Sequence, residues 1–353
     1  MTGINDGKDD VSSSMDTDSK MTKTKVSTPS QRSRIVDLGK RLALVGAWVV
    51  IVIVFGIIEH STFLSMGNLS TIFGSQAVLV ILALSLLAPM TAGDYDLSVA
   101  ANLTLASMIV GVLNVNHGWP IVAAIIVALF VGGIVGLING LISILFRIDA
   151  LIVTLGSGTL ISGVVLWISN SDTISGISPG LVSIVVVDRW LGIPLEFYYG
   201  VGICALLWYV SEYTPVGSWL LFVGRGRNVA RLSGLPITRV RLGALVASGV
   251  LSALGGVMYA GTTGSADPTS GLSFLLPAFA AVFLGSTCIL PGRFNPWGTI
   301  IAVYFLITGI TGLELLGATA FVQDLFYGGA LIVAVALGQL ARWKEVREEE
   351  LTG

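Results

Sequence analysis

Charged residues are scarce in this sequence. Only 11% of its 353 residues are Asp, Glu, Lys or Arg, and no lysine occurs between Lys40 and Lys344. A soluble domain has about 25% charged residues. This scarcity, together with a hydrophobic content of 54%, excludes a soluble globular domain and indicates an integral membrane protein. The formal net charge of −2 argues against a nucleic-acid partner.

Cysteine and histidine are also rare, with two of each. Cys204 and Cys288 lie inside apolar runs, where a free cysteine behaves as a small hydrophobic residue, so we expect no disulfide. His60 and His117 lie near the ends of apolar runs, which leaves no cluster with metal-ligand spacing. No Gly-x-x-x-x-Gly-Lys-Ser/Thr motif is present. We therefore predict no metal site, no directly bound cofactor and no ATPase site of its own.

Residues 1–34 are rich in Ser, Thr, Asp and Lys and contain no apolar run. This composition is typical of a disordered tail and does not match a signal peptide. Seven basic residues precede or enter the first apolar run, and the positive-inside rule therefore predicts a cytoplasmic N-terminus. They are Lys20, Lys23, Lys25, Arg32, Arg34, Lys40 and Arg41.

The apolar runs predict about ten transmembrane helices. Polar or turn-forming segments separate these runs, including the acidic stretch at 94–96, NVNHGWP at 114–120 and a polar external segment at 171–196 that has room for a short interfacial helix. Each run is near the 20 residues that a helix needs to cross a bilayer, whereas a barrel strand needs about 10. The predicted spans are 42–58, 69–93, 97–113, 121–146, 151–170, 197–212, 242–261, 274–290, 296–313 and 321–340.

Charge placement supports the count of ten. With a cytoplasmic N-terminus, Arg147, the arginines of 224–241, Arg293 and the basic residues after 341 all fall on the cytoplasmic side, and only Arg189 falls outside. One span more or fewer before residue 224 would split these clusters across the membrane. We therefore predict an all-α polytopic membrane protein with both termini in the cytoplasm, organised as a tail at 1–34, a transmembrane domain at 35–341 and a charged tail at 342–353.

The segment at 224–241, GRGRNVARLSGLPITRVR, contains five arginines between apolar runs. Each arginine at the bilayer centre costs roughly 2.5 to 3.5 kcal/mol, so this segment must lie in water or at the surface. We expect one or two helical turns from Asn228 to Ser233, with Asn228 as the N-cap, a left-handed Gly234 and Pro236 preventing continuation.

Two interpretations of this arginine segment remain open. It is either an ordinary positive-inside loop or a small helical element that docks against a partner. The apolar residues Val229, Leu232 and Leu235 among the charges favour docking.

Asp94 and Asp96 interrupt the apolar runs on the cytoplasmic side. Carboxylates in such a position are candidates for a functional site. The alternative is that they cap the helix beginning at Leu97, where a negative charge stabilises the N-terminal end of the helix dipole.

Uncharged polar side chains also occur within the spans. They could line a path for a hydroxylated solute, or they could form hydrogen bonds between helices. The candidates are Asn102, Thr104, Asn139, Thr154, Ser157, Thr159 and Ser162.

Four blocks of the sequence resemble one family. RNVARLSGLPITRVRLGALVASGVLSALGGVMYA, from Arg227, resembles the cytoplasmic coupling segment and following helix of permease subunits from bacterial ATP-binding-cassette (ABC) importers of the ribose, xylose and arabinose class. It matches at Ala230, Arg231, Leu232, Ser233 and Gly234, and has Asn228 where the family often has Glu. GDYDLSVAANLTLAS (93–107), GLINGLISILFRIDALIVTLGSGTLISG (136–163) and LLPAFAAVFLGSTCILPGRFNPWGTIIAV (275–303) extend the resemblance across most of the membrane region.

The resemblance implies a multi-pass permease subunit in a bacterial inner membrane that imports a sugar or polyol. It implies an ABC ATPase subunit that hydrolyses ATP, an extracytoplasmic sugar-binding protein and a second permease copy as partners, with membrane lipid around them. The implied ATPase contacts are Arg225, Arg227, Asn228, Ala230, Arg231, Leu232, Ser233 and Gly234. We assign Asp94, Asp96, Asn102, Asn139 and Thr154 to the translocation path or gate.

A second class of protein stays open on the residues alone. An ion-gradient-driven carrier for a small polar solute would use Asp94, Asp96 or Glu314 as a proton site.

Overall fold

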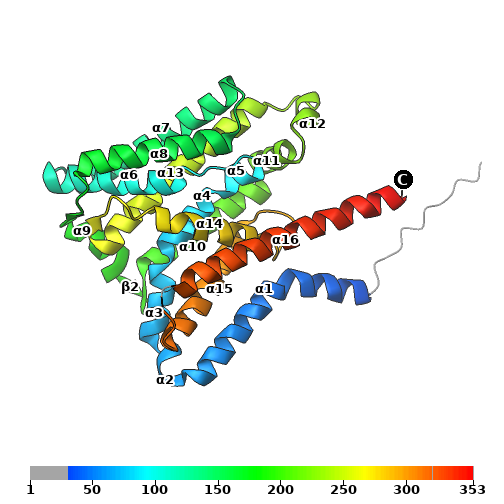
Figure 1. The fold of residues 1–353 in the computed structure, drawn as a ribbon, viewed down its shortest axis with the longest axis horizontal. Coiled ribbons are helices and arrows are strands. Elements are labelled where there is room, and N and C mark those ends of the chain that lie inside the picture. The colour runs from blue at the N-terminus through cyan, green and yellow to red at the C-terminus, as the bar shows by residue number, and fades with distance from the viewer. Residues whose placement is uncertain (1–30, 320, 353) are drawn as a thin grey trace, which may run out of the picture.

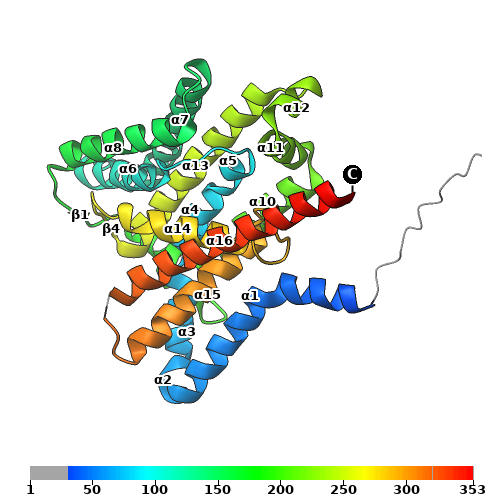
Figure 2. The same cartoon turned by 45° about the vertical axis from the view of Figure 1, so that its right-hand side comes forward.

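The computed structural model describes residues 31–319 and 321–352 and is built almost entirely from helices. Long apolar helices dominate because backbone N–H and C=O groups in a membrane need partners within their own segment. Figures 1 and 2 show the helices gathered in one bundle, with α2 (His60–Phe63) and α12 (Arg227–Leu232) at opposite ends. These two helices lie in loops that the sequence places on opposite sides of the membrane.

Seven segments of the described chain are long and apolar enough to span a membrane. In order they are Arg41–Ile58 within α1 (Gln31–Ile58), Met66–Thr91, Val99–Asn116, Ile121–Leu145 (α7), Ala150–Ser169 (α8), Ile237–Thr263 (α13) and Pro296–Leu315 (α15). The three other predicted spans correspond to α10 (Leu195–Tyr213), α14 (Leu272–Gly285) and α16 (Phe321–Thr352). The prediction of an all-α polytopic fold is confirmed, and each predicted span has a helical counterpart.

The second span lies at the centre of the core. It is divided into α3 (Met66–Ser75), α4 (Ala77–Ser85) and α5 (Leu87–Thr91), with breaks at Gln76 and Leu86. Every residue of α4 is buried, as expected for a helix that is hydrophobic all round. Helices α10, α13, α14 and α15 pack around it.

Helices α7 and α13 approach each other closely through glycines. A Cβ added at Gly136 would overlap the backbone carbonyl of Leu245, and one added at Gly249 would overlap that of Gly132. Small residues let two backbones come together in this way. Helix α6 (Val99–Gly111) packs against the same pair and continues as a π-helix, η1 (Val112–Asn116).

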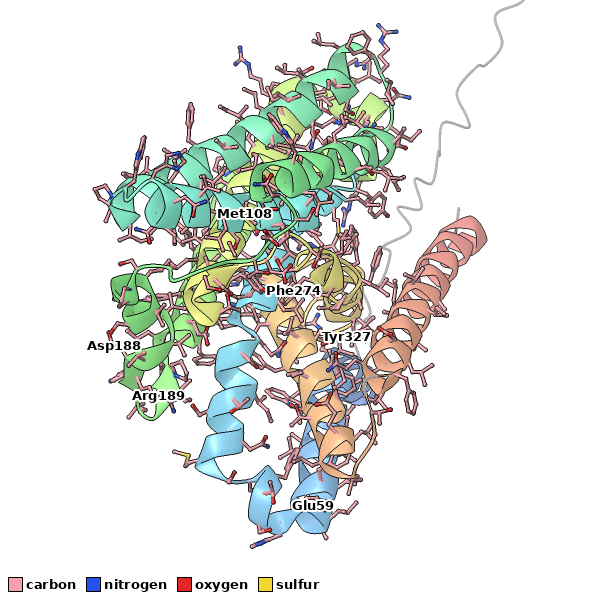
Figure 3. The ribbon with its side chains drawn as sticks, turned by 60° about the vertical axis from the view of Figure 1, so that its left-hand side comes forward. Glu59, Met108, Asp188, Arg189, Phe274 and Tyr327 are labelled. Carbon is pink, nitrogen blue, oxygen red and sulfur yellow. The ribbon has the colours of Figure 1, made fainter. Side chains whose placement is uncertain are left out.

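The external segment folds over the bundle. It contains α9 (Pro179–Val182), the π-helix η2 (Ser183–Val187) and a small pairing of β2 (Arg189–Trp190) with β3 (Ile193–Pro194). Figure 3 shows Asp188 and Arg189 at the edge of the molecule, whereas Met108 lies inside the bundle. The strand β1 (Ile174–Ser175) pairs with β4 (Ser265–Ala266), which joins two loops that the ten-span count places outside.

Both cysteines are free and buried, in agreement with the sequence. Residues 1–30 lie outside the described residues, so for them the predicted disordered tail stays a prediction. For residues 31–34 the prediction is wrong, because α1 begins at Gln31.

Candidate functional site

The arginine segment 224–241 covers the end of a helix that begins at Pro215, all of α12 and the start of α13. Helix α11 (Pro215–Arg225), which the sequence analysis missed, buries Leu220 and Val223 and exposes Trp219 and Phe222. An amphipathic helix with an exposed aromatic face is suited to the membrane interface. Helix α12 follows directly after Gly226 (Figure 1).

The predicted N-cap of α12 is wrong. The helix begins at Arg227, its N-cap is Gly226, and no side chain caps it. Gly226 is extended, at φ −176° and ψ 103°, so the chain turns into the helix two residues before Asn228. The predicted end is correct, because α12 stops at Leu232 and Gly234 has a φ of +77°.

Helix α12 presents an apolar edge to the outside. Val229 is 66% exposed and Leu232 is 89% exposed, whereas Ala230 is only 2% exposed and packs with Ala92, Leu220 and other residues beneath the helix. An exposed apolar edge on a helix whose opposite side is anchored is a typical docking element. Asn228 and Arg231 are exposed beside it.

Asp94 connects α12 to the membrane helices. Arg227 donates from Nη2 to Asp94 Oδ1 at 2.8 Å, and Arg241 in the first turns of α13 donates from Nε to Oδ2 at 2.6 Å and from Nη2 to Oδ1 at 2.8 Å. The Asp94 side chain is 3% exposed and that of Arg241 is 12% exposed. Asp94 therefore forms an ion pair with two arginines and does not cap a helix.

Asp96 has a different environment two residues further on. Its Oδ1 accepts from the backbone N–H of Ser98 at 3.0 Å and from Ser98 Oγ at 2.6 Å, and its Oδ2 accepts from Ser248 Oγ on α13 at 2.7 Å. No ion pair of Asp96 exists among the described residues. Burial raises the pKa of this carboxyl, and the three hydrogen bonds partly oppose that rise. Asp96 thus holds the turn before α6, which begins at Val99 and not at Leu97.

The loop 93–98 also contacts α7 and α8. Thr154 of α8 accepts from the backbone N–H of Leu97 at 3.0 Å and donates to the carbonyl of Tyr95 at 3.1 Å. Asn139 of α7 donates from Nδ2 to Ser98 Oγ at 2.9 Å. This loop, which we call the junction loop, therefore bonds to α7, α8, α12 and α13.

Asn102 extends the polar contacts one turn into the membrane. Its Nδ2 donates to Ser252 Oγ and to the carbonyl of Gly249, both at 2.8 Å. The Oδ1 atoms of Asn102 and Asn139 are buried and have no hydrogen-bond partner among the described residues. All five residues assigned to the path or gate are thus buried side chains of the junction loop or of the helices around it.

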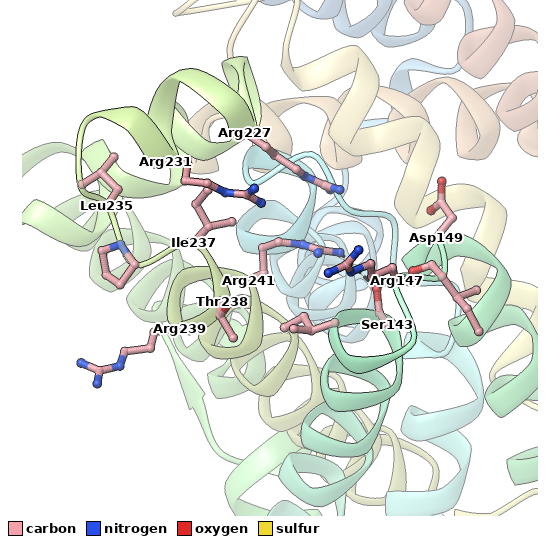
Figure 4. Close-up of a pocket in the computed structure, with 13 residues that line it drawn as sticks. Ser143, Arg147, Asp149, Arg227, Arg231, Leu235, Ile237, Thr238, Arg239 and Arg241 are labelled. Carbon is pink, nitrogen blue, oxygen red and sulfur yellow. Dashed lines mark hydrogen bonds between the residues drawn. The ribbon is translucent and has the colours of Figure 1, made fainter.

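A basic cleft of about 1080 Å³ lies between α12, the start of α13 and the connection from α7 to α8. Figure 4 shows the side chains of Arg227 and Arg231 directed toward Arg241 and Arg147 across this cleft, whereas Arg239 points away from them.

Several residues of this site were missed at the sequence level. Arg241 lay in the arginine segment but was not singled out, and Ser98, Ser248 and Ser252 lay in blocks quoted only for their resemblance. Outside this site, at the external end of the bundle, Glu196 is buried at the start of α10, and it was treated as the end of the external segment. Its signal was a carboxylate directly beside an apolar run.

Comparison with known proteins identifies the family. Residues 68–335 match the family model described as branched-chain amino acid transport system / permease component. The ribose import permease protein RbsC of Bacillus subtilis is 33% identical over 289 residues, which cover 82% of this chain and 89% of that protein. The D-allose transport system permease protein AlsC of Escherichia coli is 29% identical over 291 residues, with the same coverage of 82% and 89%.

A third relative is the fructose import permease protein FrcC of Rhizobium meliloti, which is 31% identical over 304 residues, or 82% of each chain. No solved structure matches. The matched region contains the junction loop, α12 and all spans from the second to the ninth. The chain is therefore a multi-pass membrane protein of the permease-component family of branched-chain amino acid transport systems.

Proposed function

We propose that this chain is the membrane-spanning subunit of an ATP-driven importer for a sugar or related polyol, with α12 as the element that receives a separate ATPase. The observation that carries the proposal is the connection from α12 through Asp94 to the junction loop. The relatives are permeases for ribose, D-allose and fructose, which supports a polyhydroxylated solute.

The docking surface for the ATPase is the exposed edge of α12. Val229 and Leu232 supply apolar contact area, and Arg225, Asn228 and Arg231 supply polar contacts around it. Ser233 donates to the carbonyl of Val229 at 3.0 Å and, with Gly234, ends the helix. Ala230 contributes through packing because it is buried.

Movement of α12 would be transmitted to the membrane helices through ion pairs. A displaced α12 carries Arg227, and Arg227 shares the Asp94 carboxylate with Arg241. The Arg241 and Asp94 side chains are 12% and 3% exposed, so salt screens this pair weakly, whereas the Arg227 side chain is 45% exposed. We propose that ATP-driven movement of α12 shifts the junction loop and biases α6, α7, α8 and α13 between two arrangements.

The buried polar network also fits the proposed solute. Sugar hydroxyls donate and accept hydrogen bonds, and the unpartnered Oδ1 atoms of Asn102 and Asn139 are acceptors. Uncharged groups bind such a solute without holding it by charge. We propose that Asp96, Asn102, Asn139 and Thr154 form a gate whose hydrogen bonds rearrange when the path opens.

The remaining partners follow from the same proposal. An extracytoplasmic binding protein would deliver the solute to the external segment, and a second permease copy would complete the path. ATP would act only through the ATPase subunit.

The test is a substitution on the docking edge. Leu232→Asp should abolish co-purification of the ATPase and ATP-dependent uptake while the permease still inserts, because a charge replaces the most exposed apolar contact. Leu191→Asp is the matched control for co-purification of the ATPase, since Leu191 is 73% exposed on the external segment. Normal ATPase binding by the Leu232→Asp variant would refute α12 as the docking element.

A further inference from the structure

The basic cleft has a composition that the docking of an ATPase on the outer edge of α12 does not explain. Five arginines and one carboxylate line it, namely Arg147, Arg227, Arg231, Arg239, Arg241 and Asp149. Asp94 neutralises part of this charge through Arg227 and Arg241. Even with Asp94 included, the cleft carries five positive and two negative side chains. Among the described residues, no carboxylate lies within ion-pairing distance of Arg147, Arg231 or Arg239.

The start of α13 adds hydrogen-bond donors to this charge. The first intrahelical bond runs from the N–H of Val240 to the carbonyl of Pro236 at 3.1 Å. The preceding amides of Thr238 and Arg239 therefore have no intrahelical acceptor, and both residues line the cleft. The positive end of a helix of 27 residues reinforces the arginines, and this combination of donors and charge favours a phosphate group.

The cleft lies at the depth of lipid headgroups. It is bounded by the end of the span Ile121–Leu145, the start of the span Ala150–Ser169 and the start of the span Ile237–Thr263. Ile144 and Ile148 line its wall, and the adjacent Leu145 and Phe146 are 71% and 70% exposed. An arginine cluster that continues into exposed apolar side chains matches a molecule with a phosphate and an acyl chain.

We propose that this cleft binds the phosphate of an anionic phospholipid from the cytoplasmic leaflet, with the arginines on the phosphate and the acyl chains along the end of α7. Basic pockets between transmembrane helices on the cytoplasmic side are known to bind lipid headgroups. A cleft of about 1080 Å³ exceeds the size of a free phosphate ion and suits a headgroup. Bound lipid would brace α12 and α13 against α7, beside the contacts of Asp94.

The experiment uses the assembled transporter in neutral detergent and counts bound lipid by native mass spectrometry. Short-chain phosphatidylglycerol is the ligand, phosphatidylcholine tests the need for net negative charge, and inorganic phosphate tests a soluble source. We expect Arg147→Gln to weaken phosphatidylglycerol binding by about fivefold, since a basic residue near an anionic headgroup contributes about one kcal/mol. Arg147→Lys should retain most of the binding.

Arg41→Gln is the matched control, because Arg41 is exposed at the start of the first span but does not line the cleft. Equal loss of lipid in this control and in the Arg147→Gln variant would overturn the proposal, since binding would then reflect surface charge alone. Equal binding of phosphatidylcholine, or full displacement of phosphatidylglycerol by millimolar phosphate, would also overturn the lipid assignment. None of these outcomes alters the docking test on Leu232, so the two proposals fail independently.

Discussion

The cytoplasmic and external ends of this bundle are held together by different chemistry. At the cytoplasmic end, Asp94 receives three charge-assisted hydrogen bonds from Arg227 and Arg241. At the external end, backbone pairing of β1 with β4 closes the loops, and the buried carboxylate of Glu196 accepts one bond from Thr262 at 2.7 Å. The charged end is thus the one connected to an exposed helix that a partner can move.

The largest expected effect comes from comparing the two buried carboxylates. Asp94→Asn leaves the mostly buried Arg241 without a counterion, and breaking a buried pair costs about 3–5 kcal/mol. Glu196→Gln keeps an acceptor for Thr262 and should cost about 1 kcal/mol. Thermal unfolding of the purified permease should therefore show a much lower Tm for Asp94→Asn than for Glu196→Gln. Equal Tm values would show that charge does not distinguish the two ends.

Asp172→Asn serves as the control for removing a carboxylate as such. Asp172 is exposed on the external segment, and its substitution should leave the Tm unchanged.

A smaller effect on stability is expected within the junction loop itself. Asp96→Asn should leave folding intact and lower transport. The amide oxygen of Asn can still accept from Ser98, but the amide nitrogen that replaces Oδ2 cannot accept from Ser248. A gate role predicts reduced uptake in vesicles with normal yield of assembled transporter. Loss of folded protein instead would support a purely structural turn.

The pH dependence of Asp96 has a definite sign. Burial raises its pKa in the folded state, so the native protein binds this proton more tightly than the unfolded chain does. The stabilisation is complete below the unfolded pKa of about 3.9 and is lost as pH rises through the folded value. Asp96→Asn should therefore remove a component of unfolding free energy that declines with rising pH. An unchanged pH profile would contradict this environment for Asp96.

The sequence was sufficient for the helical spans because hydropathy is a local signal. It predicted the helical counterparts of ten spans and the left-handed Gly234, and it singled out Asp94 and Asp96, whose role in transport stays a prediction. It did not predict the partners of Asp94, since Arg227 and Arg241 are 133 and 147 residues away in the chain and only packing brings them together.

Local geometry accounts for the other differences. Asn228 is a good N-cap residue in general, but the extended Gly226 starts α12 earlier. Helix α11 was missed because most of it lies between the predicted span 197–212 and the arginine segment, and its 11 residues are too few to cross a bilayer. The role of Glu196 needed the contact between α10 and α13, which the sequence pattern does not reveal.

We propose that energy enters through a partner ATPase at α12 and not through an ion gradient. Solute uptake should be measured with ATP in vesicles that contain the complete transporter. One sample receives a protonophore, and a second carries an ATPase subunit that cannot hydrolyse ATP. We predict that uptake survives collapse of the proton gradient and stops when hydrolysis is blocked. Uptake that persists without hydrolysis but disappears with the gradient would contradict the claim and identify an ion-driven carrier.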